Sequence, residues 1–321
     1  MTGDEVRAVV SAMLRGEMDT PVIVDALVRI EAEGVGAEQI AAGAEVMREN
    51  MVRVDVPDGA IDIVGTGGTG LKTLSISTAT ALVVAACGVP VAKHGNRGAS
   101  SPTGTADTLG ELGVNIAMAP ERASAAVAEV GIGFLFAPTY HPALRHVGPA
   151  RKQIGSRTLF NRLGPLCNPG GVTHMLMGVA VEDELAPMAE ALAAQPGMSA
   201  WTVRGRDGLD EITLTDTTDV VVVEGGKTVS GEIDVEALGL ERDTLTALRG
   251  GEPAENAAAL TALCDGSLGA YREIVTLNAA AALQITNRAI GWADGLSTAR
   301  DSIDSGAAKA KLAELVAFSD G

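Results

Sequence analysis

A glycine-rich turn is the first segment of the chain whose residue types suit a chemical role. Gly65-Thr66-Gly67-Gly68-Thr69-Gly70 follows the β-like run IDIV, precedes a helical stretch and matches the pattern G-x-G-x-x-G. Glycines leave backbone amides free to point at a phosphate, and the helix start, with Ser75, Ser77 and Thr78, adds hydroxyl donors and a positive dipole end. The turn predicts a phosphate site, and an ordinary glycine-rich turn is the alternative that the pattern alone leaves open.

Two common nucleotide-binding motifs do not fit this turn. The dinucleotide motif needs an acidic residue about 20 residues further on, whereas the next acid here is Asp107. The nucleoside-triphosphatase loop needs a lysine directly after its last glycine, whereas Leu71 separates Gly70 from Lys72. What remains is a phosphate-binding turn of neither class.

The distribution of acidic residues points to the charge of the ligand. Asp and Glu are absent from residues 63–106 and again from 130–181, although the chain holds 41 acids. Both windows keep basic residues, and all four histidines lie in them. Buried strands also lack charge, but burial would remove bases as well as acids. An acidic protein with two segments that carry only basic charge is expected to bind an anionic small molecule.

Several classes of protein are excluded by composition. A net charge of -17 would repel nucleic acid and anionic membranes, so neither is expected as a partner. The start of the chain has Asp4 and Glu5 where a signal peptide needs bases, and no apolar run approaches the ~20 residues that a bilayer requires. Three scattered cysteines suit reduced thiols and provide no zinc site. A cytoplasmic location is expected.

The elements that must position these residues alternate along the chain. Residues 1 to about 60 predict helices only, including one capped by Thr20 that begins at Pro21 and a second from about Ala37 to Met51. From Ile61 onward short β-like runs, including VNI at 114–116, alternate with helices, and the chain from Asn256 to about Phe318 is helical again. This order predicts an α/β domain around a mostly parallel sheet.

Three further motifs give the chain a specific family resemblance. Lys93-His94-Gly95-Asn96-Arg97 is followed by a segment with Ser100-Ser101 and Thr103-Gly104-Thr105-Ala106-Asp107, and then by RTLFNRLGPLCNP at 157–169. Together with GTGG at 65–68, these motifs closely resemble the anthranilate phosphoribosyltransferases. The likeness continues through GLDE at 208–211 and LNAA at 277–280 and so covers nearly the whole chain.

The resemblance implies a nucleoside-phosphorylase-like phosphoribosyltransferase fold. A small helical domain, residues 1–60 joined by helices from about 142–163, would accompany a larger α/β domain, residues 61–321, that binds phosphoribosyl pyrophosphate (PRPP). The implied reaction transfers the phosphoribosyl group of PRPP to the amine of anthranilate, which releases pyrophosphate in tryptophan biosynthesis. The resemblance also implies Mg2+, as two ions, and a homodimer formed through the helical domain.

Residue roles follow from the resemblance position by position. Ser77, Asp210 and Glu211 would ligate magnesium, which favours hard oxygen donors, and Lys93 would act in catalysis as a compact positive charge. The PRPP site would comprise the turn, the helix start and the segment after the second strand: Gly65, Gly68, Thr69, Thr73, Ser75, Ile76, Ser77, Thr78, Lys93, His94, Gly95, Asn96, Arg97, Gly98, Ala99, Ser100, Ser101 and Thr105.

The acceptor side rests on a second set of residues. Arg151 matches the family arginine that holds the anthranilate carboxylate, a task suited to its planar fork, and Asn96 would assist it. The remaining members of the predicted anthranilate site are Gly65, His94, Tyr140 and Pro165, with His141 nearby; packing is the alternative role of the two histidines, the tyrosine and the proline. Arg157 and Arg162 receive no role.

Two positions depart from the family pattern, which has an aspartate at position 69 and an asparagine at position 75; this chain has Thr69 and Ser75. They support one alternative function, a catalytically weak paralogue that binds a phosphorylated ligand. A related transferase with another aromatic acceptor is the second alternative, although Arg151 and Asn96 favour a carboxylated one.

Overall fold

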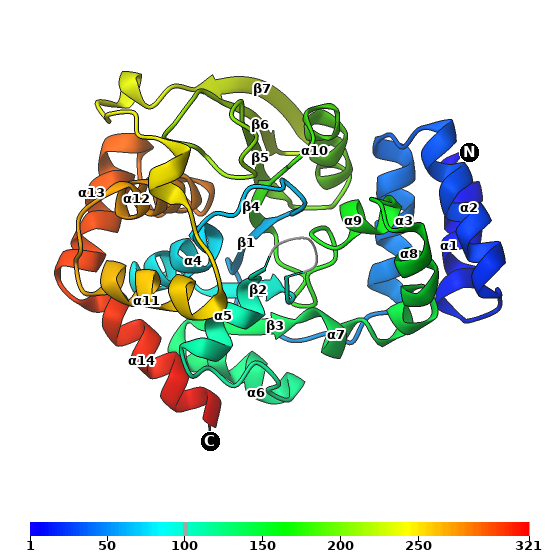
Figure 1. Ribbon diagram of the computed structural model, residues 1–321, viewed down its shortest axis with the longest axis horizontal. Helices are drawn as coiled ribbons and strands as arrows, with labels where there is room; N and C mark the ends of the chain where they lie inside the picture. The colour runs from blue at the N-terminus through cyan, green and yellow to red at the C-terminus, as the bar shows by residue number, and fades with distance from the viewer. Residues whose placement is uncertain (99–101, 321) are drawn as a thin grey trace.

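A seven-stranded sheet forms the centre of the protein in the computed structural model, which describes residues 1–98 and 102–320 (Figure 1). The predicted PRPP contacts Ala99, Ser100 and Ser101 lie outside the described residues. The strand order is β3-β2-β1-β4-β5-β6-β7, with bounds Ile61–Gly65 (β1), Val91–Gly95 (β2), Ile132–Phe136 (β3), His174–Gly178 (β4), Ser199–Gly205 (β5), Thr218–Glu224 (β6) and Lys227–Ile233 (β7).

The first five strands are parallel, and β6 and β7 add to the edge in antiparallel pairing. β2 and β3 lie on one side of β1 and β4 lies on the other. The order in which strands are added across the sheet therefore changes direction between β1 and β4, although the two strands are parallel. The register places Gly65 opposite Gly178, so both strands end at the same edge. The carboxyl edge at such a switch point is where open α/β sheets bind ligands.

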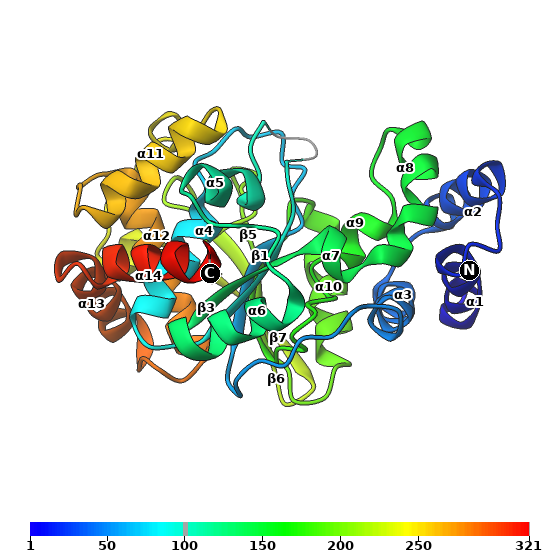
Figure 2. The ribbon, with the colours of Figure 1, turned by 90° about the horizontal axis from the view of Figure 1, so that it is seen from below.

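Helices cover both faces of the sheet, as the alternation of strands and helices predicts. One face packs on α4 (Ile76–Ala86) and on the helices of the carboxyl-terminal third, as Figure 2 shows from below. These carboxyl-terminal helices are α11 (Pro253–Cys264), α12 (Ala270–Ile285), α13 (Gly291–Asp304) and α14 (Ala307–Asp320). The remaining helices between the strands include α5 (Thr105–Glu111), α6 (Pro120–Ala125) with a π-helical turn (Ala126–Val130), α7 (Ala137–Tyr140) and α10 (Leu185–Ala193).

The amino-terminal helices stand together at the end of the molecule away from α11–α14 (Figure 1). They are α1 (Gly3–Leu14), α2 (Thr20–Glu33) and α3 (Ala37–Glu49), and α8 (Gly148–Ile154) and α9 (Leu159–Leu163) lie beside them. Ile23, Leu27 and Ile30 of α2 are buried, which confirms the predicted apolar stripe. The domain boundary at residue 60 stays a prediction, because one apolar core joins these helices to the sheet.

Two local predictions are wrong. Thr20 lies inside α2, and Asp19 occupies the N-cap position without a side-chain capping bond. Residues 114–116 form no strand; Val114 is buried in the core at the end of the α5 turn, so its apolar character reflects packing in a loop. None of the helices in the described part of the chain has the length and hydropathy needed to cross a bilayer.

Candidate active site

A cavity of about 840 Å3 opens at the carboxyl edge of β1 and β2. Its walls come from the glycine-rich turn and the start of α4, from the end of β2 and the loop after it, from the α8–α9 region and from the 210–211 turn. Apart from Asp210 and Glu211, the described lining residues come almost entirely from the two acid-free windows. The two segments that lack acidic residues therefore form most of the described lining of this cavity.

Most of the predicted site residues line this cavity. They are Gly65, Gly68, Thr69, Thr73, Ser75, Ile76, Ser77, Thr78, Lys93, His94, Gly95, Asn96, Arg97, Gly98, Thr105, Arg151, Asp210 and Glu211. Tyr140 and Pro165, which the resemblance places in the acceptor site, are not among the lining residues; both are buried. Lys72, Lys152, Arg157 and Asn161 line the cavity without having been assigned a role.

The glycine-rich turn has the backbone that only glycine adopts readily. Gly67, Gly68 and Gly70 have φ values of 63°, 83° and 72°, in the left-handed region where a side chain costs energy. The two departing side chains have local partners: Thr69 Oγ1 accepts from the Leu71 amide at 3.1 Å, and Ser75 Oγ pairs with Thr108 Oγ1 at 2.7 Å. Both hydroxyls thus stabilise the turn and the helix start.

The carboxylate turn lies directly against the ends of two strands. A Cβ at Gly65 would lie 2.4 Å from Asp210 Oδ2, and one at Gly178 would lie 1.6 Å from the Asp210 carbonyl oxygen. Asp210 Oδ2 also accepts from the Gly67 amide at 3.0 Å. The paired glycines of β1 and β4 therefore allow the carboxylates to approach the phosphate turn.

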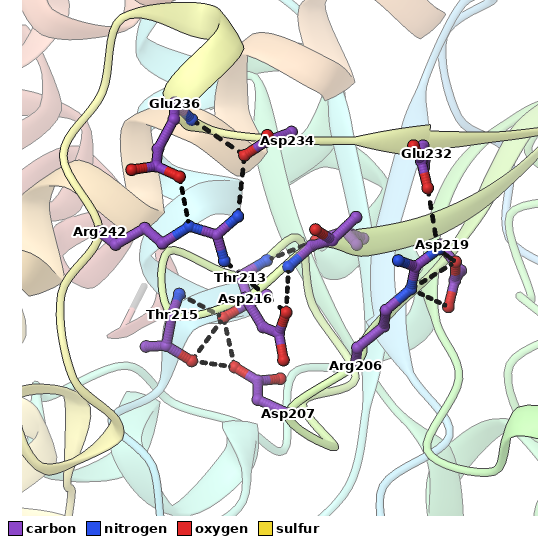
Figure 3. A network of polar contacts seen from close by, with 12 residues as sticks. Arg206, Asp207, Thr213, Thr215, Asp216, Asp219, Glu232, Asp234, Glu236 and Arg242 are labelled. Atoms are coloured by element: carbon purple, nitrogen blue, oxygen red, sulfur yellow. Dashed lines mark hydrogen bonds and ion pairs between the residues drawn. The ribbon is translucent and has the colours of Figure 1, made fainter.

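A network of polar contacts anchors the loop that carries these carboxylates (Figure 3). Asp207 Oδ2 accepts from Thr213 Oγ1 at 2.5 Å and from Thr215 Oγ1. Further along, Arg242 pairs with Asp216 at 3.7 Å and with Asp234 at 3.0 Å. Asp207 thus binds the far end of its own loop through Thr213 and Thr215, and Arg242 binds the same loop at Asp216. Asp210 and Glu211 lie in the sequence between these two anchored positions.

Lys93 is a buried cation that interacts with the Glu211 carboxylate. Its Nζ donates to the Ile63 carbonyl oxygen at 2.5 Å and to Ser77 Oγ at 3.4 Å. Burial lowers the pKa of Lys93, and the nearby Asp62 and Glu211 carboxylates oppose that change. Burial, with the adjacent Asp210 charge, raises the pKa of Glu211 to about 8. A cation bound here would relieve the repulsion between the two acids.

These donors fit magnesium. Two carboxylates and the Ser77 hydroxyl are hard oxygen groups, the kind that Mg2+ binds, usually with one or two carboxylates and with substrate phosphates or water completing the shell. No group of three or more His, Cys, Asp and Glu side chains arranged to hold a metal is found in residues 1–98 and 102–320. A metal ion at this position would therefore need further ligands from a bound phosphate. The glycine-rich turn would hold that phosphate next to the carboxylates.

Arg151 is a cation that no described carboxylate pairs with. Among the described residues, the guanidinium has one hydrogen bond, from Nη2 to Asn161 Oδ1 at 3.4 Å, and its Cζ lies 5.9 Å from the centre of the Phe160 ring. Burial lowers the pKa of the guanidinium. A cation in this situation is suited to an anionic ligand, and Asn96, which also lines the cavity, supplies an amide.

Two histidines form a buried cluster, in which His94 lines the cavity and His141 does not. The ring centroids of His94 and His141 lie 5.1 Å apart, and burial lowers their pKa values to about 3 and about 4. Their Nε2 atoms and the Tyr140 hydroxyl have no hydrogen-bond partner among the described residues. Both rings are neutral at pH 7, so neither adds charge to an anion site.

One buried acid near the site was not singled out from the sequence. Asp62 of β1 is fully buried, accepts from the His94 amide at 3.1 Å and accepts from Asn168 Nδ2 at 2.7 Å. Burial raises the pKa of Asp62 to about 6, with Lys93 opposing that shift. A charged residue inside the apolar run IDIV is the signal that identifies it.

The glycine-rich turn lies beside the Asp210–Glu211 pair at the carboxyl edge of an open α/β sheet, an arrangement that suits a protein that binds a phosphorylated small molecule. Residues 58–309 match the family model described as "Glycosyl transferase family, a/b domain". The chain is 48% identical to the anthranilate phosphoribosyltransferase of Azorhizobium caulinodans, with 97% of this chain and 91% of the relative covered. For the Parvibaculum lavamentivorans enzyme of the same name the identity is 49%, with 99% and 93% covered.

Solved structures give the same result. The anthranilate phosphoribosyltransferase of Thermus thermophilus superposes with a TM-score of 0.94 at 41% identity, covering 100% of this chain and 96% of that chain. The Saccharomyces cerevisiae enzyme in complex with PRPP and Mg superposes with a TM-score of 0.88 at 27% identity, covering 99% and 92%. The chain belongs to the anthranilate phosphoribosyltransferase family, and the fold and family predicted from its motifs are confirmed.

Proposed function

We propose that this protein transfers the 5-phosphoribosyl group of PRPP to the amine of anthranilate, giving N-(5-phosphoribosyl)anthranilate and pyrophosphate in tryptophan biosynthesis. The observation that carries the proposal is a single cavity lined by two unlike sets of groups. One set comprises the glycine-rich turn and the Asp210–Glu211 pair, and the other includes Arg151, which has no ion-pair partner among the described residues. These two sets suit a diphosphate and a carboxylate.

The geometry supports catalysis by positioning and charge. In ribosyl transfer, pyrophosphate leaves C1 as the neutral aromatic amine approaches, so no side-chain nucleophile is required. Arg151 and Asn96 would orient the acceptor, and the turn amides with Lys93 would hold the leaving diphosphate, which together place both reactants in line. Bound Mg2+ would neutralise negative charge that develops on that diphosphate, held by Asp210, Glu211 and Ser77.

The remaining site roles are part of the same proposal. Residues 73–78 and 93–98, with Thr105, would surround the phosphates and ribose, because all of them line the cavity. His94 would border the acceptor ring, with Tyr140 and Pro165 behind it. We propose two Mg2+ ions, one beside the carboxylate pair and one nearer Ser77, which a titration of metal binding in the presence of PRPP would count.

We also propose a cytoplasmic homodimer formed through the amino-terminal helices. Val22 and Val28 of α2 are each 51% exposed in the single chain, and a second copy seated there would cover them. Analytical ultracentrifugation of the wild type beside a Val22→Glu variant would test this arrangement. A sedimentation coefficient of the monomer for both proteins would contradict it.

The experiment that tests the function follows the loss of anthranilate fluorescence with PRPP and Mg2+ present. Consumption that requires all three components is expected, with pyrophosphate released in equal amount. An enzyme that binds PRPP but consumes no anthranilate would favour the weak paralogue, and consumption of a different aromatic amine would favour the related transferase.

A further inference from the structure

A chain of ion pairs leads from the amino-terminal helices to the phosphate turn. Glu31 of α2 pairs with Arg162 Nη1 at 2.8 Å, and Arg162 Nη2 pairs with Glu184 Oε1 at 2.8 Å. The other oxygen of Glu184 pairs with Arg157 Nη2 at 2.9 Å. Arg157 Nη1 in turn donates to the Gly67 carbonyl oxygen at 2.8 Å. The chain therefore ends on the peptide at the centre of the glycine-rich turn.

The charge of Arg157 is already balanced within this chain. Two guanidinium groups face two carboxylates, and the Glu184 side chain is only 8% exposed. Charge-assisted bonds of this kind, shielded from water, keep a side chain in one position. Although Arg157 lines the cavity, it differs from Arg151, whose charge has no described partner. Arg157 is thus suited to holding the turn and Arg151 to holding a ligand.

The backbone of Gly67 is held at both its amide and its carbonyl group. Its amide donates to Asp210 Oδ2 at 3.0 Å and its carbonyl accepts from Arg157 at 2.8 Å. The absence of a side chain at Gly68 allows Arg157 to approach the turn, because a Cβ at that position would lie 2.6 Å from Arg157 Nη1. A turn with three left-handed glycines has many conformations open to it when it is not held. The two bonds select the observed one.

We propose that Arg157 is a positioning residue for PRPP, which fixes the Gly67 peptide so that the amides of the turn are already arranged when the diphosphate arrives. Glu184 orients Arg157, and Arg162 stabilises Glu184 without reaching the turn. The inference rests on the proposed function. Without Arg157 the turn has to be ordered on binding, which weakens affinity for PRPP. The acceptor side, with its own arginine, keeps its affinity.

The test compares two arginines that share one carboxylate. PRPP affinity is measured by calorimetry with Mg2+ for the wild type, Arg157→Met and Arg162→Met, together with the thermal unfolding of each. Arg157→Met is expected to weaken PRPP binding about 10-fold, the effect of one lost charge-assisted bond. Arg162→Met loses its ion pairs with Glu31 and Glu184, which are largely shielded from water, so its melting temperature falls. Its PRPP affinity stays within about 2-fold of the wild type.

Equal loss of PRPP affinity in the two variants would overturn the proposal, because it would show that Arg157 acts through stability alone. Arg157→Lys gives a second measurement if the methionine variant does not fold. A lysine supplies the charge but reaches either Glu184 or the Gly67 carbonyl, so this variant should recover part of the PRPP affinity. Full wild-type affinity would contradict the inference that Arg157 must bind both groups at once.

Kinetics separates this inference from the proposed function. At saturating PRPP, the KM for anthranilate should be the same in the wild type and Arg157→Lys, while the KM for PRPP rises. A wild type that consumes no anthranilate refutes the proposed reaction, and that result is read without any variant. The positioning role is tested by the ratio of the PRPP affinities of Arg157→Met and Arg162→Met. A ratio of one refutes that role.

Discussion

Replacing Arg151 with methionine separates binding from folding more sharply than other changes at this site. The guanidinium has one hydrogen bond, to Asn161 at 3.4 Å, and no ion-pair partner among the described residues. Burial without a partner lowers its pKa, which means that the surroundings disfavour the charge. The fold therefore gains little from Arg151, whereas a bound carboxylate would gain its counter-ion.

The magnitude follows from the lost bond. Hydrogen bonds to charged groups contribute about 1.5–3 kcal/mol, which corresponds to a rise of roughly 10–150-fold in the KM for anthranilate. The KM for PRPP should change by less than about 3-fold, because the hydrogen bond of the Arg151 guanidinium goes to Asn161 and not to the phosphate turn. Both constants come from the loss of anthranilate fluorescence, with each substrate varied while the other is saturating.

Lys152 provides the matched control, because it adjoins Arg151 in the sequence and also lines the cavity. Lys152→Met removes one positive charge and should leave the KM for anthranilate nearly unchanged. Chemical denaturation should give Arg151→Met a free energy of unfolding equal to or above that of the wild type. An unchanged KM in Arg151→Met, equal effects of the two substitutions, or a large loss of stability would each refute the reasoning.

Three further outcomes are expected. Changing Asp210→Asn together with Glu211→Gln should abolish most Mg2+-dependent turnover without unfolding the protein, as a Mg2+ titration beside circular dichroism would show; wild-type activity would exclude a metal role. Thr69→Asp should lower the half-saturating Mg2+ concentration, because a carboxylate at the turn recruits the cation, and identical titration curves would place position 69 away from the metal. Folding lowers the pKa of His141 to about 4, so below pH ~6.5 the unfolded chain binds a proton that the folded chain does not. Stability from this group is present above that pH and is lost as the pH falls: from pH 7 to 5 the wild type should lose about 2 kcal/mol more than His141→Leu in urea titrations.

The parts of the fold that the sequence predicts are those with a clear periodicity. The strands at 61–65 and 91–95 and the helix from Ile76 lie where the apolar runs place them. The strand Lys227–Ile233 could not be found in this way, because all but its last residue are exposed and it has no buried face to produce an alternating pattern. Residues 114–116 mislead for a different reason, since the apolar Val114 is buried although it lies in a loop.

The predicted site depends on two kinds of signal. Backbone features such as the glycine-rich turn are local, so the sequence identifies them directly. Partners are not local: Arg157 and Glu184 are far apart along the chain, and no pattern pairs them before the fold does. Tyr140 shows a further limit, because the resemblance places it in the acceptor site, whereas its side chain is buried and is not among the residues that line the cavity.

The two glycines that face Asp210 limit how this enzyme can change in evolution. Any side chain at Gly178 would collide with the backbone of the carboxylate turn, and any at Gly65 would collide with the carboxylate itself. The distance between Asp210 and the phosphate turn is therefore set by backbone atoms. A single side-chain substitution at either glycine cannot change that distance by a small amount. Position 69 has no such constraint, since within the described part of the chain its hydroxyl accepts from the Leu71 amide of its own turn. Inherited variation in the use of metal is expected to accumulate there, and Thr69 is one of the positions at which this chain departs from its family's pattern.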